Sequence, residues 1–377
     1  MPHLDWDMSI RIEDEMRKQG IHFRPEETIA EVSGTTRLES AVTTKGEVLE
    51  ADLYIIATGV LPNTALATSI GVDLGETGAI VTDSTMQTNL EGVYAVGDVA
   101  ESFHVITGKP IYRPMATTAN KMGRIAGDAM TGGTLRFQGI LGTGILRFFD
   151  LTIAQTGLTE KEALGEGYDV AVLFNIKPDK PAYMAGQEMV IKAIADKQTH
   201  RILGVQIIGA QGVDKRIDVF ASTITLGVKA EDLFHMDLAY APPYSSAKDP
   251  VNMAGFMIDN IAKGTLKQWH LEDMDKISKD KDVVLLDVRT VGEFSRGHID
   301  GFKNIPVDEL RERISEIEKG KPVYLICQSG LRSYIASRIL EGNGYETYNF
   351  SGGFRFYDAV VNDRALIERA YACGMDY

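Results

Sequence analysis

Short apolar runs alternate with charged segments along the chain, and the spacing of the apolar positions predicts the type of each element. Residues 10–19 carry apolar side chains at helical spacing among charged ones, which predicts a helix that ends at Gly20. A strand predicted at residues 93–96 runs directly into Gly97 and Asp98. Three more short runs predict strands at residues 21–23, 38–43 and 53–57.

The pattern is most regular between residues 139 and 264, where strands and helices alternate. A helix is predicted before this region, at residues 114–130, with Pro114 near its first turn. Within the region, strands are predicted at residues 170–175, 189–195 and 202–208. Helices are predicted at residues 159–164, 213–225 and 246–262.

The pattern breaks at residues 265–282, where charges and a Trp-His pair interrupt it, and this segment is expected to be a linker with an entry helix. A new domain then begins at residue 283. Apolar runs predict strands at residues 283–287 and 322–327, and a helix is predicted at residues 333–340.

The composition limits the class of protein. The chain has 377 residues, enough for two or three domains, and it is 44% hydrophobic and 24% charged, as is ordinary for a globular protein. A formal net charge of −14 argues against nucleic acid as the main partner. No apolar run is long enough to span a membrane, and residues 1–7 show no signal peptide. The two cysteines, Cys327 and Cys373, suit a reducing compartment, so we expect a cytoplasmic protein, with no metal site.

Residues 88–98 (T-N-L-E-G-V-Y-A-V-G-D) place a glycine and a carboxylate after an apolar run, as a cofactor site requires. Gly97 lets a ligand approach the backbone closely, and Asp98 can accept hydrogen bonds from a polyol. The segment resembles the second flavin motif of the FAD-dependent pyridine nucleotide-disulfide oxidoreductases. The resemblance implies that Asp98 binds the ribityl chain of FAD.

Two further segments fit this resemblance. The A-T-G turn that contains Thr58 and Gly59 resembles the place where these enzymes pass from the NAD(P)H domain back to the FAD domain. The helix predicted at residues 114–130 corresponds to one whose N-terminus, near Ala116, points at the flavin. An ordinary amphipathic helix is the alternative for this last segment.

The loop C-Q-S-G-L-R, from Cys327 to Arg332, lies between a predicted strand and a predicted helix. The sulfur would lie at the carboxyl end of a parallel strand, where α/β folds bind ligands. Small residues let successive backbone N–H groups point inward, and the helix N-terminus and Arg332 add positive potential. We therefore expect the thiolate of Cys327, or a persulfide on it, to be stabilised. The other loop residues expected to line this site are Gln328, Ser329, Gly330 and Leu331.

Five short motifs of the C-terminal region occur in the order and spacing of a rhodanese domain, and the resemblance spans residues 270–360. These motifs are D-V-R, E-F, G-H-I, N-I-P and the cysteine loop. In rhodaneses the loop cysteine carries sulfur as a persulfide between a donor and an acceptor, which implies that role for Cys327. The C-x4-R spacing is one residue shorter than in related phosphatase loops, which favours sulfur over phosphate. The alternatives are a buried cysteine that only closes a strand, or a domain that binds or relays without turnover. Cys373 has no comparable setting.

The rhodanese region and the segment Y-A-P-P-Y-S at residues 240–245 together resemble a narrower branch. Its members are coenzyme A-disulfide reductases and NADH-dependent polysulfide or persulfide reductases fused to a rhodanese domain. The resemblance implies that Tyr240 lies against the flavin of the partner subunit in a homodimer, and that Lys248 approaches the coenzyme A phosphates. It also implies that Asn120 lines the substrate site and that Tyr183 assists the redox thiol. Interface packing for Tyr240 and an exposed helix charge for Lys248 are the alternatives.

The expected fold is a multidomain α/β and α+β chain. It would contain part of a Rossmann-like FAD/NAD(P)-binding region, an α+β dimerisation domain and an α/β rhodanese domain. The expected bounds are residues 1–60 for a remnant of the NAD(P)H-binding domain, 61–135 for the C-terminal part of the FAD-binding domain, 136–264 for the dimerisation domain and 265–377 for the linker and rhodanese domain. The first flavin motif (G-x-G-x-x-G), the NAD(P)H glycine motif and the redox cysteine of the family have no counterpart here. We therefore expect an internal fragment or a truncated reading frame, which would bind FAD poorly.

The expected function is that of a parent enzyme that moves hydride from NAD(P)H through FAD to a coenzyme A disulfide, persulfide or polysulfide. Its rhodanese domain would exchange sulfur with small-molecule donors and acceptors at Cys327. Two alternatives remain open from the sequence. The chain could be a non-catalytic dimeric module that binds a partner or senses oxidants, or a sulfurtransferase without flavin chemistry.

Overall fold

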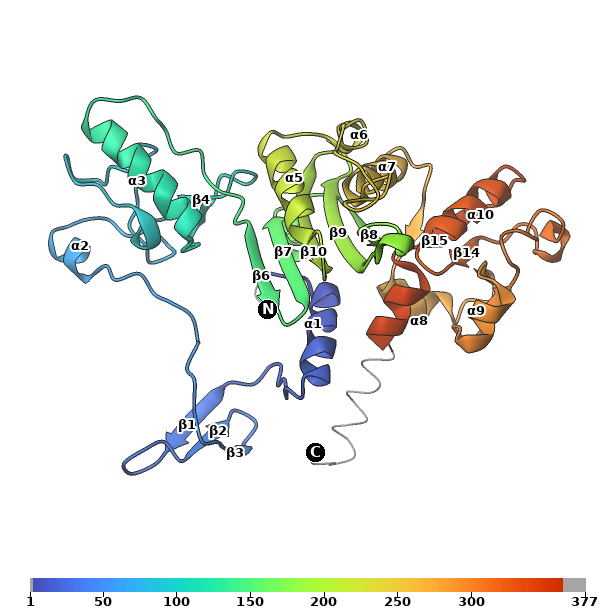
Figure 1. Cartoon of the computed structure of the whole chain (residues 1–377), viewed down its shortest axis with the longest axis horizontal. Coiled ribbons are helices and arrows are strands. Elements are labelled where there is room, and N and C mark those ends of the chain that lie inside the picture. The colour runs from blue at the N-terminus through green and yellow to red at the C-terminus, as the bar shows by residue number, and fades with distance from the viewer. Residues whose placement is uncertain (1–2, 362–377) are drawn as a thin grey trace. The chain divides into compact units, whose positions relative to one another are not determined.

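The computed structural model describes residues 3–361, which form two compact units (Figure 1). The larger unit contains residues 3–11, 104–108 and 139–361 of the described chain, and the smaller contains residues 12–103 and 109–138. Cys373 lies outside the described residues. Among residues 3–361, no helix has both the length and the apolar character needed to cross a lipid bilayer.

The smaller unit starts within helix α1 (Trp6–Lys18), so the helix predicted at residues 10–19 begins earlier than expected. The sheets of this unit are small and antiparallel, one with the order β1-β2-β3 and one that pairs β4 with β5. The helix predicted at residues 114–130 is confirmed as α3. The bounds of the elements are β1 (Ile29–Ser33), β2 (Ser40–Thr43), β3 (Val48–Glu50), α2 (Ala65–Ser69), η1 (Gly97–Val99), β4 (Ser102–Phe103), β5 (Pro110–Ile111) and α3 (Ala116–Met130).

Three strand predictions in this unit are wrong. Residues 21–23 and 53–57 form no strand, and the strand predicted at residues 93–96 is reduced to a single bridge at Tyr94. The leucine and isoleucine side chains of residues 53–57 are exposed. An apolar run becomes a strand only where a neighbouring strand supplies hydrogen-bond partners, and the described part of the chain supplies none at these positions. Only the run at residues 38–43 is confirmed, as β2.

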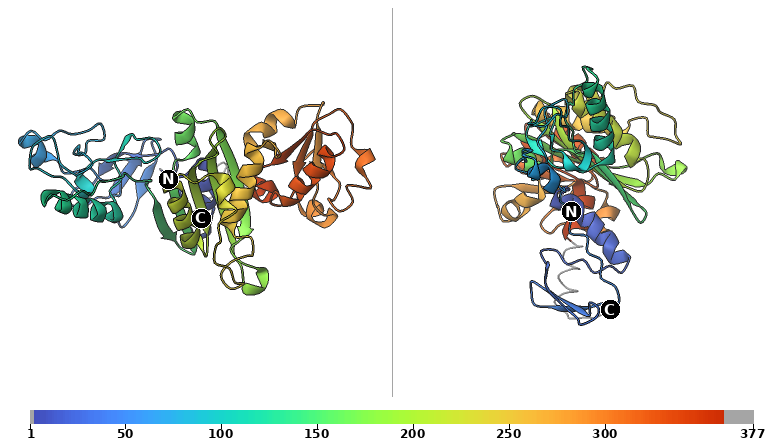
Figure 2. Two further views of the ribbon diagram at one scale, coloured as in Figure 1. Left: turned by 90° about the horizontal axis from the view of Figure 1, so that it is seen from above. Right: turned by 90° about the vertical axis from the view of Figure 1, so that its left-hand side faces the viewer.

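The larger unit contains a five-stranded antiparallel sheet with the order β6-β7-β10-β9-β8, called the central sheet below (Figures 1 and 2). Alternate residues of its strands face helices α5 and α7 and bury a large apolar cluster with them. The strand and helix predictions for residues 159–225 are confirmed. The bounds are β6 (Gly144–Phe148), β7 (Leu151–Gly157), α4 (Glu160–Gly165), β8 (Val170–Pro178), η2 (Ala182–Met184), β9 (Glu188–Asp196), β10 (Ile202–Gly209), α5 (Val213–Thr225), α6 (Ala230–Leu233) and α7 (Pro250–Ala262).

Helix α7 begins four residues later than predicted. The Asp249 side chain caps it by accepting a hydrogen bond from the Val251 backbone N–H at 3.0 Å, and Pro250 occupies the first helical position. Both residues favour a helix start at this point, because the first N–H groups of a helix have no partner inside it. Residues 246–248 therefore lie in the segment that precedes the helix.

The other face of the central sheet carries a buried cluster of charges. The ammonium of Lys192 in β9 is fully buried and lies 3.1 Å from Asp5 and 2.7 Å from Asp7. A third carboxylate, Glu160, lies 2.7 Å from the same nitrogen, and Gln206 of β10 donates a hydrogen bond to Asp5. These contacts hold the segment that begins α1 against the sheet.

The C-terminal part of the larger unit is a parallel five-stranded sheet with the order β11-β15-β14-β12-β13. Helix α10 packs on β14 and β15, and the strands and helix predicted for this region are confirmed. β14 has neighbours on both sides, so its carboxyl end lies in the middle of the sheet. The bounds are β11 (Gln268–Trp269), η3 (Leu271–Asp273), α8 (Met274–Ile277), β12 (Val284–Asp287), α9 (Val291–Arg296), β13 (Lys303–Asn304), η4 (Ile314–Glu316), β14 (Val323–Ile326), α10 (Leu331–Glu341) and β15 (Thr347–Phe350).

Candidate functional site

Cys327 lies between the central strand β14 and helix α10. Its side chain is only 1% exposed, and Gly330, with a φ of 100°, turns the chain from the loop into the helix. The Cys327 Sγ accepts a hydrogen bond from the Gly330 backbone N–H at 3.1 Å and another from the Ser333 hydroxyl at 3.2 Å. A sulfur anion at this position would therefore have two donors in a site removed from water.

This arrangement differs from the several inward-pointing backbone N–H groups expected from the sequence. Within residues 3–361, one backbone N–H rather than several donates to the sulfur, and the second donor is the buried side chain of Ser333. Asn349 of β15 donates to the Gly330 carbonyl at 3.1 Å and fixes the turn. The only sequence signal for Ser333 was its position in the first turn of the helix that follows the loop. Leu331 is half exposed, and Gln328 accepts a long hydrogen bond of 3.4 Å from Arg289.

Arg332 directs its charge at a carboxylate. Its guanidinium donates to both Glu293 oxygens, at 2.6 and 2.7 Å. These hydrogen bonds raise the pKa of Arg332 and hold the pKa of Glu293 at about 2. Glu293 also closes a capping box with Thr290 at the start of α9, so the partner of Arg332 is itself held in place. The charge expected to act on the sulfur is thus shared with Glu293, a residue of the E-F motif that the sequence does not predict as part of the site.

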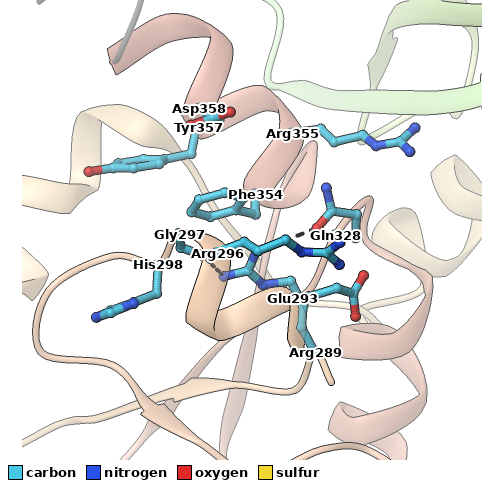
Figure 3. Close-up of a pocket in the computed structure, with 10 residues that line it drawn as sticks. All are labelled: Arg289, Glu293, Arg296, Gly297, His298, Gln328, Phe354, Arg355, Tyr357 and Asp358. Atoms are coloured by element: carbon cyan, nitrogen blue, oxygen red, sulfur yellow. Dashed lines mark hydrogen bonds between the residues drawn. The ribbon is translucent and has the colours of Figure 1, made fainter. Parts of the chain in front are cut away.

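A second arginine, Arg289, is buried at the carboxyl end of β12. It pairs with Asp287 at 2.7 Å, and its guanidinium carbon lies 3.8 Å from the centre of the Phe354 ring. A cavity of about 490 Å³ opens beside this arginine, and Figure 3 shows Gln328 of the cysteine loop at its edge. The side chains around this cavity carry several positive charges. Its lining residues are Arg289, Glu293, Arg296, Gly297, His298, Gln328, Phe354, Arg355, Tyr357 and Asp358.

The segment that follows β15 holds the cysteine loop in place through backbone hydrogen bonds. The Phe354 N–H donates to the Cys327 carbonyl at 2.7 Å, and the Arg355 N–H donates to the Gln328 carbonyl at 3.1 Å. Gly353 has a φ of 65°, and a Cβ on it would lie 2.7 Å from both the Cys327 carbonyl oxygen and the Ser329 nitrogen. Only glycine fits at this position, because both the backbone angle and the clearance exclude a side chain.

The residues expected to hold a flavin divide into two groups. Gly97 and Asp98 form the short helix η1, next to α3, and a Cβ on Gly97 would lie 3.5 Å from Ala119 of that helix. The amide of Asn120 donates to the Ala116 carbonyl at 2.9 Å, and Asp98 is exposed. The structure thus brings these four predicted residues to one end of α3.

Thr58 and Gly59 do not join that group. Both lie in an exposed, irregular segment, and within residues 3–361 no hydrogen bond connects them to Asp98 or α3. Their proposed role therefore depends on the sequence resemblance alone. The first turn of α3 has no side-chain cap. The Thr118 N–H donates to the Met115 carbonyl at 3.0 Å, so the N–H groups that precede Thr118 in this turn are the ones open to a ligand.

Tyr183, Tyr240 and Lys248 lie on two segments that the buried residue Arg216 connects. Tyr183 is in η2, within the β8–β9 loop, and Tyr240 and Lys248 are in the segment before α7. The Arg216 guanidinium donates at 3.1 Å to the Asp179 carbonyl in the first segment, and also at 3.1 Å to the Ser245 hydroxyl in the second. Tyr183 is 73% exposed and Tyr240 is 51% exposed, so both rings are open to a ligand or to a partner subunit.

The Asp249 carboxylate lies 3.0 Å from the Arg216 guanidinium and neutralises its charge. Burial by itself would raise the pKa of Asp249, but hydrogen bonds from Val251 and Ser245 and the charge of Arg216 outweigh burial and lower that pKa. Neither residue of this pair was singled out in the sequence. The available signal was an arginine at an apolar-face position of α5, between Val213 and Phe220.

The described residues contain no cluster of three or more histidine, cysteine or carboxylate side chains that could hold a metal ion.

Three family models match the chain. Residues 1–123 match the pyridine nucleotide-disulphide oxidoreductase model, and residues 145–250 match the dimerisation domain of the same enzymes. Residues 270–359 match the rhodanese-like domain.

Curated relatives match about two thirds of the chain. An NAD(P)H sulfur oxidoreductase (CoA-dependent) of Pyrococcus furiosus is 48% identical over 241 residues, which are 64% of this chain and 54% of the relative. A coenzyme A disulfide reductase of Staphylococcus epidermidis is 32% identical over 256 residues, which are 67% of this chain and 57% of the relative. The chain thus spans about half the length of the curated relatives that it matches.

Two solved structures resemble nearly the whole chain. The reduced CoADR-RHD of Bacillus anthracis has a TM-score of 0.93 and 36% identity, and the match covers 97% of this chain and 65% of that one. An NAD-dependent persulfide reductase from A. fulgidus has a TM-score of 0.86 and 36% identity, with 94% of this chain and 64% of that one covered.

Proposed function

Given that the chain belongs to the pyridine nucleotide-disulphide oxidoreductase family and also carries a rhodanese-like domain, we propose that it is part of a coenzyme A-dependent disulfide, persulfide or polysulfide reductase. Its own C-terminal domain carries sulfur on Cys327. One observation carries the sulfur-transfer proposal: Gly330 and Ser333 both donate hydrogen bonds to the Cys327 Sγ.

The two donors suit a sulfur-transfer cycle that begins and ends with Cys327 as a thiolate. The Cys327 thiolate attacks the outer sulfur of thiosulfate or of a persulfide, a new S–S bond forms, and the old bond to that sulfur breaks. The leaving sulfite or thiolate departs with the electron pair of that bond. A thiol or cyanide then attacks the outer sulfur of the cysteine persulfide and regenerates the thiolate. Hydrogen bonds from Gly330 and Ser333 stabilise the anion at the beginning and at the end of this cycle.

The residues of the smaller unit fit a flavin. Asp98 offers an exposed carboxylate to a polyol chain, Gly97 allows close approach, and the uncapped start of α3 at Ala116 offers N–H groups to a ring oxygen. Thr58 and Gly59 are assigned to the same cofactor by resemblance. FAD, when bound, would supply the electron transfer from NAD(P)H to the disulfide or persulfide substrate.

Three of the proposed coenzyme A contacts belong to the larger unit: Tyr183 and Tyr240 are assigned to proton donation toward the departing thiolate, and Lys248 to a phosphate. Asn120, which belongs to the smaller unit, is assigned to the substrate site by resemblance. Since the family's dimerisation domain is present, we propose that Tyr240 and Lys248 act in the active site of a second copy in a homodimer. A reducing compartment such as the cytoplasm suits a site that works as a free thiol.

The sulfur-transfer proposal is tested by incubating the purified chain with thiosulfate and cyanide and measuring thiocyanate. We expect turnover by the unmodified chain and by Cys373→Ala, and none by Cys327→Ala. Intact mass after incubation with thiosulfate alone should show a gain of one sulfur atom that requires Cys327. If neither thiocyanate nor the mass gain appears, the proposed sulfur-transfer function is wrong.

A further inference from the structure

Two lysines lie where strand β8 meets the beginning of helix α7. The Asn175 side chain of β8 donates to the Pro250 carbonyl at 3.1 Å, which fixes this meeting point. Lys177 is two residues further along β8, so its side chain emerges on the same face of the sheet as that of Asn175. Lys248 is two residues before Pro250 in the segment that approaches the same place.

Neither lysine has an acidic partner within the described residues 3–361. Lys177 is partly buried, whereas Lys248 is exposed. Burial, followed by the charge of Lys248, lowers the pKa of Lys177, as expected for two ammonium groups close together. Partly buried charges are normally paired, so an unpaired lysine beside a second lysine indicates a place for an anion.

The acidic residues nearby are already engaged. The Asp249 carboxylate is held by Arg216, Ser245 and the Val251 N–H, and Asp179 accepts a hydrogen bond from the Gln187 N–H at 2.7 Å. Two further lysines occupy the same region and are themselves held. Lys180 donates to Gln211 at 2.8 Å, and Lys215 donates to the Ala239 carbonyl at 3.1 Å. The region therefore carries an excess of positive charge, and Lys177 and Lys248 are the members of this cluster that have no partner among the described residues.

We infer that Lys177 and Lys248 together bind the phosphate-bearing end of a thiol or disulfide substrate, and that Lys177 is the binding residue not assigned before. This inference rests on the proposed function, because it concerns the same coenzyme A site. A phosphate or diphosphate group carries enough negative charge to neutralise both ammonium groups at once, and a lysine binds phosphate as a point charge. The site would thus select phosphorylated thiols over thiols of similar shape that lack phosphate.

Competitive labelling of lysine amines in the full chain, read by peptide mass spectrometry, tests the inference. We expect coenzyme A to slow the labelling of Lys177 and Lys248 together by about threefold or more, and pantetheine, which lacks phosphate, to leave both unchanged. Inorganic pyrophosphate as a third probe distinguishes a general anion site from one that needs the whole thiol. If pyrophosphate protects the two lysines and coenzyme A does not, the proposed thiol substrate is rejected and the site is a general anion site.

The matched control is Lys197, which directly follows β9 and already pairs with Asp169 at 2.9 Å, so no probe should protect it. In the Lys177→Gln variant, about fivefold more coenzyme A should be needed to protect Lys248 to the same extent. Lys197→Gln should leave that concentration unchanged. Equal protection by pantetheine, unchanged protection of Lys248 in Lys177→Gln, or no protection of Lys177 at all would overturn the inference. Thiocyanate formation at Cys327 does not require Lys177, so failure of this inference is distinguishable from failure of the sulfur-transfer proposal.

Discussion

The backbone of Gly353 lies directly against the carbonyl of Cys327, and a Cβ added to the glycine would approach that oxygen to 2.7 Å. The geometry of the cysteine loop thus depends on a residue more than twenty positions away in the sequence. The Phe354 N–H also donates to the same carbonyl at 2.7 Å, so the segment after β15 determines where the loop begins.

Gly353→Ala should lower the free energy of unfolding by more than the backbone strain of a side chain at positive φ explains. Gly344 has a φ of 80° with open space around its Cα, so Gly344→Ala should lower the free energy of unfolding by about 1–2 kcal/mol from backbone strain alone. Gly353→Ala carries the same strain plus the clash with Cys327, which adds about 1–3 kcal/mol. Urea denaturation of both variants measures the difference. Equal losses would show that the loop relaxes away from Gly353 without cost.

Removing the hydroxyl of Ser333 should slow sulfur transfer. A hydrogen bond to a charged group contributes about 1.5–3 kcal/mol, so Ser333→Ala should reduce thiocyanate formation by about tenfold or more. Ser337→Ala is the matched control, because Ser337 is also buried in α10 but donates to the Tyr334 carbonyl and not to sulfur. If both variants lose the same activity, the Ser333 hydroxyl supports only the helix.

The ion pair between Glu293 and Arg332 should persist to low pH. The pKa of Glu293 in the folded chain is about 2, below its ordinary value of 4.5, so its contribution to stability is present above pH 4.5 and is lost as the pH falls toward 2. Because the pair is partly exposed, we expect Glu293→Gln to lower the free energy of unfolding by about 1 kcal/mol at pH 7. Urea titrations between pH 6 and pH 3 check the sign: the difference between the two proteins should shrink as the pH falls. A difference that stays constant over this range would contradict the assignment.

Asp7 should give the opposite pH dependence. Burial raises its pKa to about 6 from 3.8, although Lys192 opposes the rise. The folded chain therefore binds this proton more tightly than the unfolded chain, and the contribution of Asp7 to stability falls as the pH rises from about 4 through 6. Asp7→Asn should remove this dependence, so that the free energy of unfolding changes less between pH 8 and pH 5 than in the unmodified chain. A steeper change in the variant would contradict the prediction.

Removing Arg216 should release the two segments that carry the tyrosines. Arg216→Met leaves the buried Asp249 carboxylate without its main partner, which should lower the free energy of unfolding by about 3–5 kcal/mol. Lys215→Met is the control, because Lys215 is only partly buried and lies 3.8 Å from the same carboxylate. Hydrogen exchange should rise at residues 179–187 and 239–249 in the Arg216 variant. If exchange is unchanged in both segments, Arg216 does not hold them.

Prediction from the sequence worked best where the periodicity was long. Helix α5 matches its predicted bounds, and strands β8, β9 and β10 match within a few residues, since many apolar positions support each of these elements. Prediction failed at residues 53–57, where five residues with an apolar pattern form no strand. A strand requires hydrogen bonds from another strand, and no local pattern reveals whether that partner is present.

The sequence by itself determined where the proposed chemistry was to be sought, because the Cys327 loop and the Gly97-Asp98 turn are contiguous segments whose residue types and spacing are visible in the sequence. Only the tertiary structure decided which groups act on that chemistry. Ser333, Gly353 and Arg216 reach their partners through chain turns or across elements, where packing sets the distance between atoms. Hydrogen bonds and steric exclusion depend on that distance and not on separation along the chain, so the sequence signals at Ser333 and Arg216 do not reveal which partner each side chain reaches.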